Sequence, residues 1–345
     1  MRLHRRIGAG AGVIALTMVA AACGSTASGD SGDSATNDSL QVLQLPNQVY
    51  DLLVKVGQDE GFFEERGVTI TTADYPTSLE ASQAMKATKS DVVQLTSGSL
   101  VSSWQAGAGL QYFCGTEPII PNEIMAAPGT ELPSMANGAT WQEVLRSLAG
   151  KKVAFPTPEG TGWWKLWVAA MKEAGVDEKD VITINTGTAT NAIQPLLDKG
   201  DVDAAMVSST GTQFLKESGK AVTLMPFAEG PSVYKDLYAA AYAAPASAIA
   251  ERPEVFAAFC DGIGDALAYV QDPANLNGSA QTLAELQGLS PDVARSAVSE
   301  VFPLFITDLP DARMQATIDT YVREGVVAET PLPTVEDLVA DSARN

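Results

Sequence analysis

The stretch Ala84-Met-Lys-Ala-Thr-Lys-Ser-Asp-Val-Val-Gln-Leu-Thr-Ser97 decides the fold class, because its pattern recurs later in the chain. The pattern is a helix end, an acidic turn, a short apolar strand and then hydroxyl residues. Its counterpart is Pro195-Leu-Leu-Asp-Lys-Gly-Asp-Val-Asp-Ala-Ala-Met-Val-Ser-Ser209. Two copies of one helix–strand unit, set far apart in 345 residues, predict two α/β lobes of similar construction.

Short apolar runs alternate with helix-length segments on both sides of these copies. The expected strands are residues 41–45, 68–73, 92–95, 110–114, 152–155, 181–185, 204–207 and 222–225. The expected helices are residues 49–61, 78–88, 163–174 and 189–198. This βαβα order predicts an α/β fold in which each lobe has a mainly parallel sheet flanked by helices.

The N-terminus has the order of a secretory signal. A basic head with three arginines precedes the uncharged, apolar residues 7–22, a run too short for the roughly 20 residues of a membrane-spanning helix. Small residues then lead into Cys23, which resembles a bacterial lipobox with Ala20 where Leu is commoner. The resemblance implies cleavage of residues 1–22 and lipidation of Cys23. The alternative is an ordinary signal peptide with an unmodified cysteine. Residues 23–39 are then a flexible tether of small and polar residues.

Charge and composition exclude several classes of function. After loss of residues 1–22 the chain has 19 basic and 42 acidic residues, a formal charge of −23, and should repel nucleic acid. His4 is the only histidine and lies in the signal, so a Ser-His-Asp triad and a His-ligated metal site are excluded. We therefore expect no catalytic residues, no metal and no cofactor. Cys114 and Cys260 either form a disulfide or are two buried thiols.

Hydroxyl residues follow one strand in each half. Ligands in open α/β sheets bind beyond the carboxyl ends of the strands. Two facing lobes would therefore present Thr96, Ser97 and Ser99, and from the other lobe Ser208 and Ser209, to a common cleft. The alternative is that Ser and Thr merely populate loops.

Five short motifs give a family resemblance by their order. They are Gly61-Phe-Phe-Glu-Glu-Arg-Gly-Val-Thr-Ile70, Ser90-Asp-Val92, Thr96-Ser-Gly-Ser99, Cys114-Gly-Thr-Glu-Pro118 and Gly200-Asp-Val-Asp-Ala204. From about residue 40 to 270 the chain resembles the solute-binding lipoproteins of bacterial ABC importers, in the nitrate/sulfonate/taurine/thiamine-pyrimidine class.

The resemblance implies a two-lobed periplasmic-binding-protein fold of type II. Lobe 1 would comprise residues 40–120 and 240–345, and lobe 2 residues 121–239. Two crossing strands would join them near residues 118–125 and 234–243. Cys114 and Cys260 would then share a lobe, which favours their disulfide.

The strand–turn–helix at residues 152–164 is the best single candidate for a ligand site. Free amides at a helix start, with Thr161 as the cap, can hold an anion or a carbonyl group. In the family this turn faces the cleft, which implies ligand contacts from Thr157, Gly160, Thr161 and Trp163. The alternative is a capped helix without a ligand. Of the three neighbouring tryptophans we expect Trp163 to face the cleft and Trp164 or Trp167 to be packed.

Other candidate ligand contacts follow the first strand and the hydroxyl loops. They are Asn47, Tyr50, Ser97, Gly98, Ser99, Ser208 and Ser209. Glu117, Glu159 and Glu229 are candidate partners for a cationic or donor-rich solute, and we expect at least two of them to be solvated loop acids. No basic residue stands at a predicted strand end. We therefore expect an uncharged or partly cationic organic solute, and heterocycles are among the candidates.

The resemblance implies a monomeric, non-enzymatic protein outside the cytoplasm. It would be anchored to the cell membrane by Cys23 and deliver a small-molecule solute to an ABC permease. One alternative is a ligand sensor for a membrane receptor. Another is an enzyme of pyrimidine metabolism on the same fold, but those relatives depend on histidine and iron, and residues 23–345 contain no histidine.

Overall fold

The computed structural model describes residues 38–45, 48–75, 80–81, 84–85, 90–186 and 190–344. The predicted signal, Cys23, Asn47 and residues 24–37 of the predicted tether lie outside the described residues, as does most of the predicted helix 78–88. The predicted end of the tether at residue 39 is wrong, because Asp38 and Ser39 are already part of the first strand. The described residues belong to one compact unit. Its strands form two five-stranded sheets, called sheet A and sheet B here.

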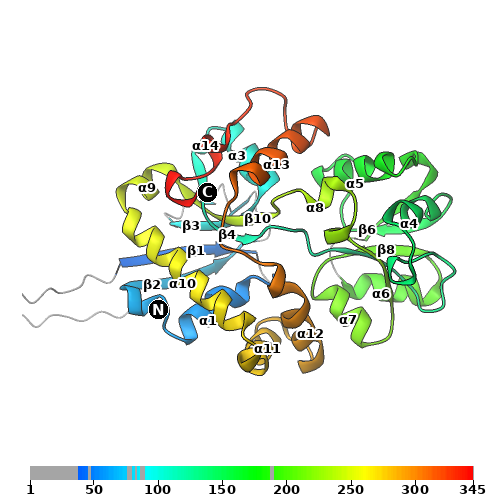
Figure 1. Ribbon diagram of the computed structural model, residues 1–345, viewed down its shortest axis with the longest axis horizontal. Helices are drawn as coiled ribbons and strands as arrows, with labels where there is room; N and C mark the ends of the chain where they lie inside the picture. The colour runs from blue at the N-terminus through cyan, green and yellow to red at the C-terminus, as the bar shows by residue number, and fades with distance from the viewer. Residues whose placement is uncertain are drawn as a thin grey trace, which may run out of the picture. The chain divides into compact units, whose positions relative to one another are not determined.

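Sheet A has the strand order β2-β1-β3-β10-β4 (Figure 1). Its strands are β1 (Asp38–Gln44), β2 (Val68–Asp74), β3 (Val92–Thr96), β4 (Leu110–Glu117) and β10 (Ala240–Pro245). β1 pairs in parallel with β2 and β3, whereas β10 is antiparallel to β3 and β4. The helices in this part of the chain are α1 (Asp51–Asp59), α3 (Ser97–Gln105), α9 (Ala246–Glu251), α10 (Pro253–Gln271), α11 (Leu276–Gln287), α12 (Pro291–Val301), α13 (Asp311–Arg323) and α14 (Val335–Leu338).

Sheet B has the order β7-β6-β8-β5-β9. Its strands are β5 (Glu123–Ala126), β6 (Lys152–Phe155), β7 (Ile182–Asn185), β8 (Ala204–Val207) and β9 (Val222–Pro226). β6 is parallel to β7 and β8, whereas β5 is antiparallel to β8 and β9. The helices are α4 (Trp141–Ser147), α5 (Gly162–Glu173), α6 (Thr190–Lys199), α7 (Gly211–Glu217) and α8 (Ser232–Lys235).

The two sheets share one construction. The antiparallel strand of each sheet, β10 in sheet A and β5 in sheet B, lies second from an edge. It is also the first strand that the chain forms after it arrives from the other sheet. The chain leaves sheet A at the end of β4 and enters sheet B as β5; it returns through α8 to β10 (Figure 1). This arrangement orients the carboxyl ends of the parallel strands of both sheets toward the connections.

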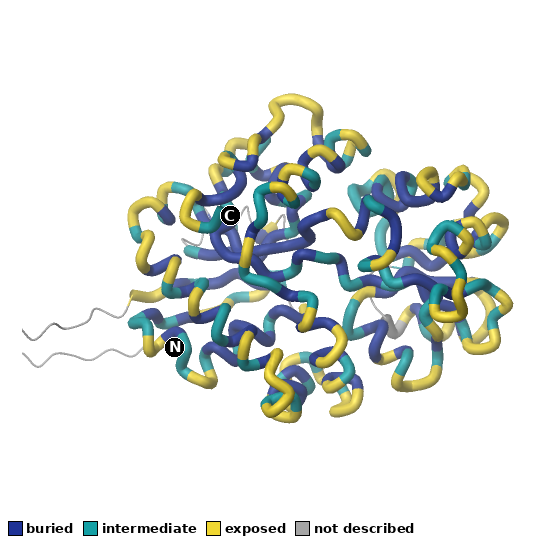
Figure 2. Tube along the Cα trace, viewed as in Figure 1, coloured by how far each residue is buried: buried dark blue, intermediate teal, exposed yellow. Residues whose placement is uncertain are grey.

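Apolar side chains form three buried clusters. The buried residues run through the interior of the parts that hold the two sheets (Figure 2). One cluster lies between sheet A and helices α1 and α10–α12, and includes Phe63, Phe256 and Phe259. A second lies in sheet B against α6 and α7. The third runs through both sheets and includes the returning connection at Tyr234 and Tyr238. The core is therefore continuous across the connections.

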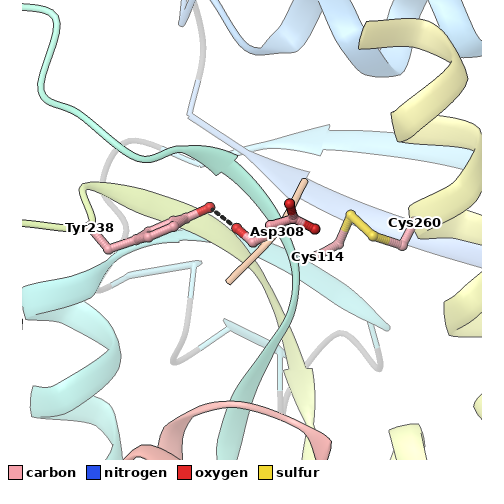
Figure 3. The surroundings of a disulfide bond; sticks show 4 residues. All are labelled: Cys114, Tyr238, Cys260 and Asp308. Carbon is pink, nitrogen blue, oxygen red and sulfur yellow. Dashed lines mark hydrogen bonds between the residues drawn. A yellow bond between two sulfur atoms is a disulfide. The ribbon is translucent and has the colours of Figure 1, made fainter. Parts of the chain in front are cut away.

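A disulfide joins Cys114 of β4 to Cys260 of α10 (Figure 3). The Cα atoms are 5.3 Å apart, within the ordinary range for disulfides. The bond fixes α10 to the strand that leads into the first connection.

Gly115, next to this disulfide, is a point of close backbone approach. Its N–H donates to Thr307 O at 2.8 Å, and a Cβ at this position would lie 2.3 Å from Tyr238 Oη. Tyr238 Oη itself donates to Asp308 O at 2.8 Å (Figure 3). Only glycine fits here without displacing its neighbours.

The predicted strands and most of the predicted helices are confirmed. All eight expected strands are present, and those at residues 152–155 and 204–207 have the predicted bounds. Helices α1, α5 and α6 occupy three of the expected helical segments. Gly67 adopts a left-handed conformation (φ 72°) where the sequence predicts a turn. Among the described residues, no helix has the length and apolar character of a membrane span.

Candidate functional site

The helix starts that follow β3 and β6 meet at one side chain, Val326. A Cβ placed on Gly98, in the first turn of α3, would lie 4.0 Å from Val326 Cγ1, and one placed on Gly162, at the start of α5, would lie 3.1 Å from it. α3 follows a strand of sheet A, and α5 follows a strand of sheet B. The carboxyl ends of the two sheets therefore face a common region, which we call the interlobe site.

The turn between β6 and α5 is built by two threonines. Thr161 Oγ1 accepts from Trp164 N at 3.4 Å and so caps α5, as predicted. It also donates to Pro158 O at 2.8 Å and lies 2.9 Å from Thr157 Oγ1. Gly160 is exposed and left-handed (φ 81°), the conformation that glycine adopts without steric cost. The Thr161 hydroxyl thus forms hydrogen bonds with backbone groups of this same turn.

The three tryptophans of α5 differ in their surroundings. Trp167 is fully buried, and Trp164 packs edge-on against Phe155 with ring centroids 5.6 Å apart. Trp163 is half-buried and directly follows Gly162, where an added Cβ would lie 3.1 Å from Val326 Cγ1. Trp163 is therefore the α5 tryptophan nearest in sequence to Gly162.

The polar groups at the start of α3 form hydrogen bonds with other groups of the protein. Ser97 is buried, and its Oγ donates to Tyr238 O at 2.5 Å. Thr96 Oγ1 caps α3 by accepting from Ser99 N and also donates to Ser99 Oγ at 2.9 Å. The N–H of Gly98 interacts with the Tyr321 hydroxyl. The structure gathers the predicted residues at this helix start, with their polar groups bonded to the protein.

The turn after β8 has a strained backbone. Ser208 is exposed, and its carbonyl accepts from Thr212 N at 3.0 Å; Ser209 is half-buried. Thr210 has φ 61° and ψ −39°, which is unfavourable for a β-branched residue, and its N–H donates to Gln213 Oε1 at 2.9 Å. Such strain is commonest at ligand-binding and switch segments, so Thr210 joins the candidate residues.

Tyr50 and Glu117 bring the start of α1 and the end of β4 together. Tyr50 is buried immediately before α1, and its pKa is raised chiefly by burial and further by the neighbouring acids Asp51 and Glu117. Burial raises the pKa of Glu117 itself to about 8. Asp51 also has its pKa raised to about 8, chiefly by burial and further by Asp74, although the Gln48 N–H opposes the shift.

Of the three candidate acids, Glu117 is the one enclosed by the fold. Glu159 and Glu229 are both exposed, as expected for two of the three. Glu117 is half-buried at the end of β4, and its backbone carbonyl accepts from Ala239 N at 3.0 Å. It therefore lies where both connections begin and end.

Three further polar residues beside Glu117 were not among the predicted site residues. Gln94, Thr116 and Tyr242 are all buried in the strands of sheet A. Gln94 lies in a strand that reads as an apolar run, and Tyr242 reads as core. The available signal was a glutamine inside an otherwise apolar strand, a position where a polar side chain requires a partner.

Hydrogen bonds and ion pairs connect helices of the two lobes beside this region. Lys216 of α7 pairs with Glu300 of α12 at 3.0 Å, and Gln213 also donates to Glu300 at 3.1 Å. Lys165 of α5 donates to Gly325 O. Lys165 is the basic residue nearest in sequence to the start of α5, and its side chain is occupied by this hydrogen bond. Within the described segments, no group of three His, Cys, Asp or Glu side chains is arranged to hold a metal.

Solved structures of similar fold include several periplasmic binding proteins. The periplasmic aliphatic sulphonate-binding protein SsuA of Escherichia coli has a TM-score of 0.70 and 17% identity over 89% of this chain and 98% of its own. The nitrate-binding protein NrtA of Synechocystis has a TM-score of 0.65 and 12% identity over 88% and 86%. The alkanesulfonate-binding SsuA of Xanthomonas axonopodis, bound to MOPS, has a TM-score of 0.62 and 16% identity over 89% and 98%.

These similarities confirm the predicted fold class, a two-lobed α/β periplasmic-binding-protein fold of type II. No curated protein matches the chain. The model of the family described as "NMT1/THI5 like" matches residues 52–275, which is more than half of the chain. The chain therefore belongs to the NMT1/THI5-like family.

Proposed function

We propose that this protein is an extracytoplasmic solute-binding protein that captures a small organic solute in the interlobe site and delivers it to an ABC permease. The observation that supports this most strongly is the convergence of Gly98 and Gly162 on Val326. It places the helix starts of two sheets around one region, the position where open α/β sheets bind ligands. The family membership and the binding proteins of similar fold support the same function.

The N-terminal sequence supports a membrane location for this function. Cleavage before Cys23 and lipidation of its sulfur would anchor the chain, and residues 24–37 would separate the folded unit from the membrane. Replacement of Cys23 by Ser should release the protein from the membrane fraction of the producing bacterium. Retention of the Cys23→Ser variant in that fraction would contradict the anchor.

A ligand screen tests the binding function directly. Thermal unfolding of residues 24–345 would be followed with sulfonates, nitrate, amino acids, pyrimidines, aromatic acids, and amines or amidines. A ligand at 100 times its dissociation constant adds about 2.7 kcal/mol to the free energy of unfolding. A clear rise in melting temperature for one chemical class is the expected result. A folded protein that no member of the panel stabilises would count against the function.

Tryptophan fluorescence then locates the bound solute. Trp163 is half-buried beside Gly162, so a ligand in the interlobe site should change its emission. Trp163→Phe should abolish most of the change. Trp104→Phe is the matched control, because Trp104 is also half-buried but lies near the opposite end of α3 from Gly98. Loss of the signal only in the Trp104 variant would place the ligand elsewhere.

A further inference from the structure

The C-terminal end of α13 reaches the interlobe site. Residues 324–326 end this helix, and we call them the α13 cap. Gly325 is left-handed (φ 63°), and its N–H donates to Val322 O at 3.0 Å. The N–H of Val326 donates to Tyr321 O at 2.7 Å. Together these two hydrogen bonds form a Schellman motif, which fixes the position of Val326 relative to α13.

The side chain of Val326 lies against both helix starts of the interlobe site. Val326 Cγ1 is 3.1 Å from the position of a Cβ on Gly162 and 4.0 Å from that of a Cβ on Gly98. Neither glycine has a positive φ, so the backbone conformation does not require glycine at either place. The shorter distance is below the roughly 3.5–4.0 Å of ordinary carbon contacts, so any larger residue at position 162 would press on Val326. The α13 cap therefore occupies the space next to the first turn of α5.

A lysine of α5 also holds the α13 cap. Lys165 is half-buried, and its Nζ donates a hydrogen bond to Gly325 O. Lys165 follows Gly162 by three residues, so the two lie on the same face of α5. This face of the helix therefore meets the cap at two points, Gly162 and Lys165.

The contacts of α3 hold the α13 cap from both sides along the chain. Before the cap, the hydroxyl of Tyr321 interacts with the N–H of Gly98. After the cap, Gln105 Nε2 donates to Ala328 O at 2.8 Å and to Pro331 O at 3.0 Å. These contacts fix the cap to the sheet A part of the fold, whereas its hydrogen bond to α5 depends on the long side chain of Lys165.

We propose that the α13 cap is a gate on the interlobe site, and that Lys165 holds it closed against α5. This inference rests on the proposed function. A solute reaches the start of α5 when the hydrogen bond from Lys165 to Gly325 opens and Val326 moves away from Gly162. The contacts between the cap and α3 would survive this opening, because they do not involve α5. Opening would also free the ammonium group of Lys165 to bond with acceptor atoms of a solute.

Cysteine reactivity measures whether small molecules reach the cap. The only cysteines of residues 24–345 are Cys114 and Cys260, which form the disulfide, so a Val326→Cys variant has a single free thiol. Its rate of reaction would be measured with two small organic ions, 2-sulfonatoethyl and 2-aminoethyl methanethiosulfonate. Ala328→Cys is the reference, because Ala328 is exposed and lies two residues beyond the cap. The Val326→Cys variant should react more slowly than the Ala328→Cys variant, since α5 covers its thiol.

Removal of the Lys165 donor should open the gate. In the Val326→Cys background, Lys165→Met should speed the reaction with both reagents roughly twofold to tenfold, the change expected from the loss of one hydrogen bond of ordinary net strength. In the Ala328→Cys background the rate should not change. Lys172→Met is the matched control, because it removes the same charge from an exposed position near the end of α5 and should leave every rate unchanged.

The two reagents separate opening of the gate from an effect of charge. Lys165→Met removes a positive charge, which by itself would slow the sulfonate reagent and speed the amine reagent. Opening of the gate should speed both. Ser99→Cys is a second reporter, a near-isosteric change directly after Gly98, and it should also react faster in the Lys165→Met background. It covers the case in which Val326→Cys does not fold, and circular dichroism checks the fold of each variant.

The outcomes distinguish the gate from the proposed function, because these rates are measured without a bound solute. Equal rates for the Val326→Cys and Ala328→Cys variants would overturn the inference, since the cap would already be open. Rates that Lys165→Met leaves unchanged, or changes in opposite directions for the two reagents, would also overturn it. If the rates were as expected but no member of the ligand panel stabilised the protein, the proposed function would fail while the movement of the cap would stand.

Discussion

Replacing Gly115 by Ala tests the close packing that holds the end of β4 against the returning chain. The added Cβ would lie 2.3 Å from Tyr238 Oη and 2.7 Å from the carbonyl oxygens of Thr307 and Asp308. Ordinary carbon contacts require more than 3 Å, so two backbone carbonyls would have to move. The hydrogen bonds from Gly115 N to Thr307 O and from Tyr238 Oη to Asp308 O, both 2.8 Å, would be strained or lost.

The expected destabilisation follows from these two effects. Overpacking a tight site costs about 1–3 kcal/mol, and each lost hydrogen bond adds about 0.5–1.5 kcal/mol. Gly115→Ala should therefore lower the free energy of unfolding by about 2–6 kcal/mol. Urea unfolding followed by circular dichroism would show it as a lower midpoint with an unchanged slope.

Two further variants make the result specific. Gly264→Ala is the control, because a Cβ on Gly264 of α10 meets nothing within 4 Å and should stabilise the helix by up to about 1 kcal/mol. Tyr238→Phe in the Gly115→Ala background removes the closest atom and should recover part of the loss. A Gly115→Ala protein within 0.5 kcal/mol or so of the wild type would refute the packing argument.

Three other perturbations have defined expectations. Cys114→Ala with Cys260→Ala opens a loop of 146 residues and should cost up to about 5 kcal/mol in urea unfolding; a loss below about 1 kcal/mol would contradict this. Because the Glu117 pKa rises from 4.5 to about 8 on folding, its ionisation should lower the free energy of unfolding between those pH values. Urea midpoints from pH 4.5 to 8 should therefore fall less steeply for Glu117→Gln; identical slopes would argue against the raised pKa. Thr210→Gly should relieve the strain at φ 61° and raise the free energy of unfolding by about 1 kcal/mol, and a clear destabilisation would show that the strain is absent.

The elements of the fold could be predicted because their signals are local. Short apolar runs such as residues 152–155 and 204–207 predicted the bounds of strands. Thr161 predicted the start of α5, because its hydroxyl can cap a helix. Gly67 gave a turn because glycine adopts the left-handed conformation without steric cost.

Contacts made across long stretches of sequence gave no comparable signal. Nothing near Val326 indicates that it lies between Gly98 and Gly162. The sequence does not distinguish three loop acids, Glu117, Glu159 and Glu229. Glu117 alone of these three is partly buried, because β10 returns to pair beside it on β4. Ser97 shows the opposite case, because its hydroxyl reads as a ligand group but bonds to Tyr238 O inside the protein.

The disulfide also determines how the chain would carry mechanical load. Cys114 precedes the first connection and Cys260 follows the second, so the bond closes a loop around all of sheet B. A pull between the N-terminus and the C-terminus would pass through the bond and bypass residues 115–259. Reduction would release that loop and lengthen the extended chain by roughly 500 Å. With the bond intact, tension between the two ends of the chain would leave sheet B unloaded.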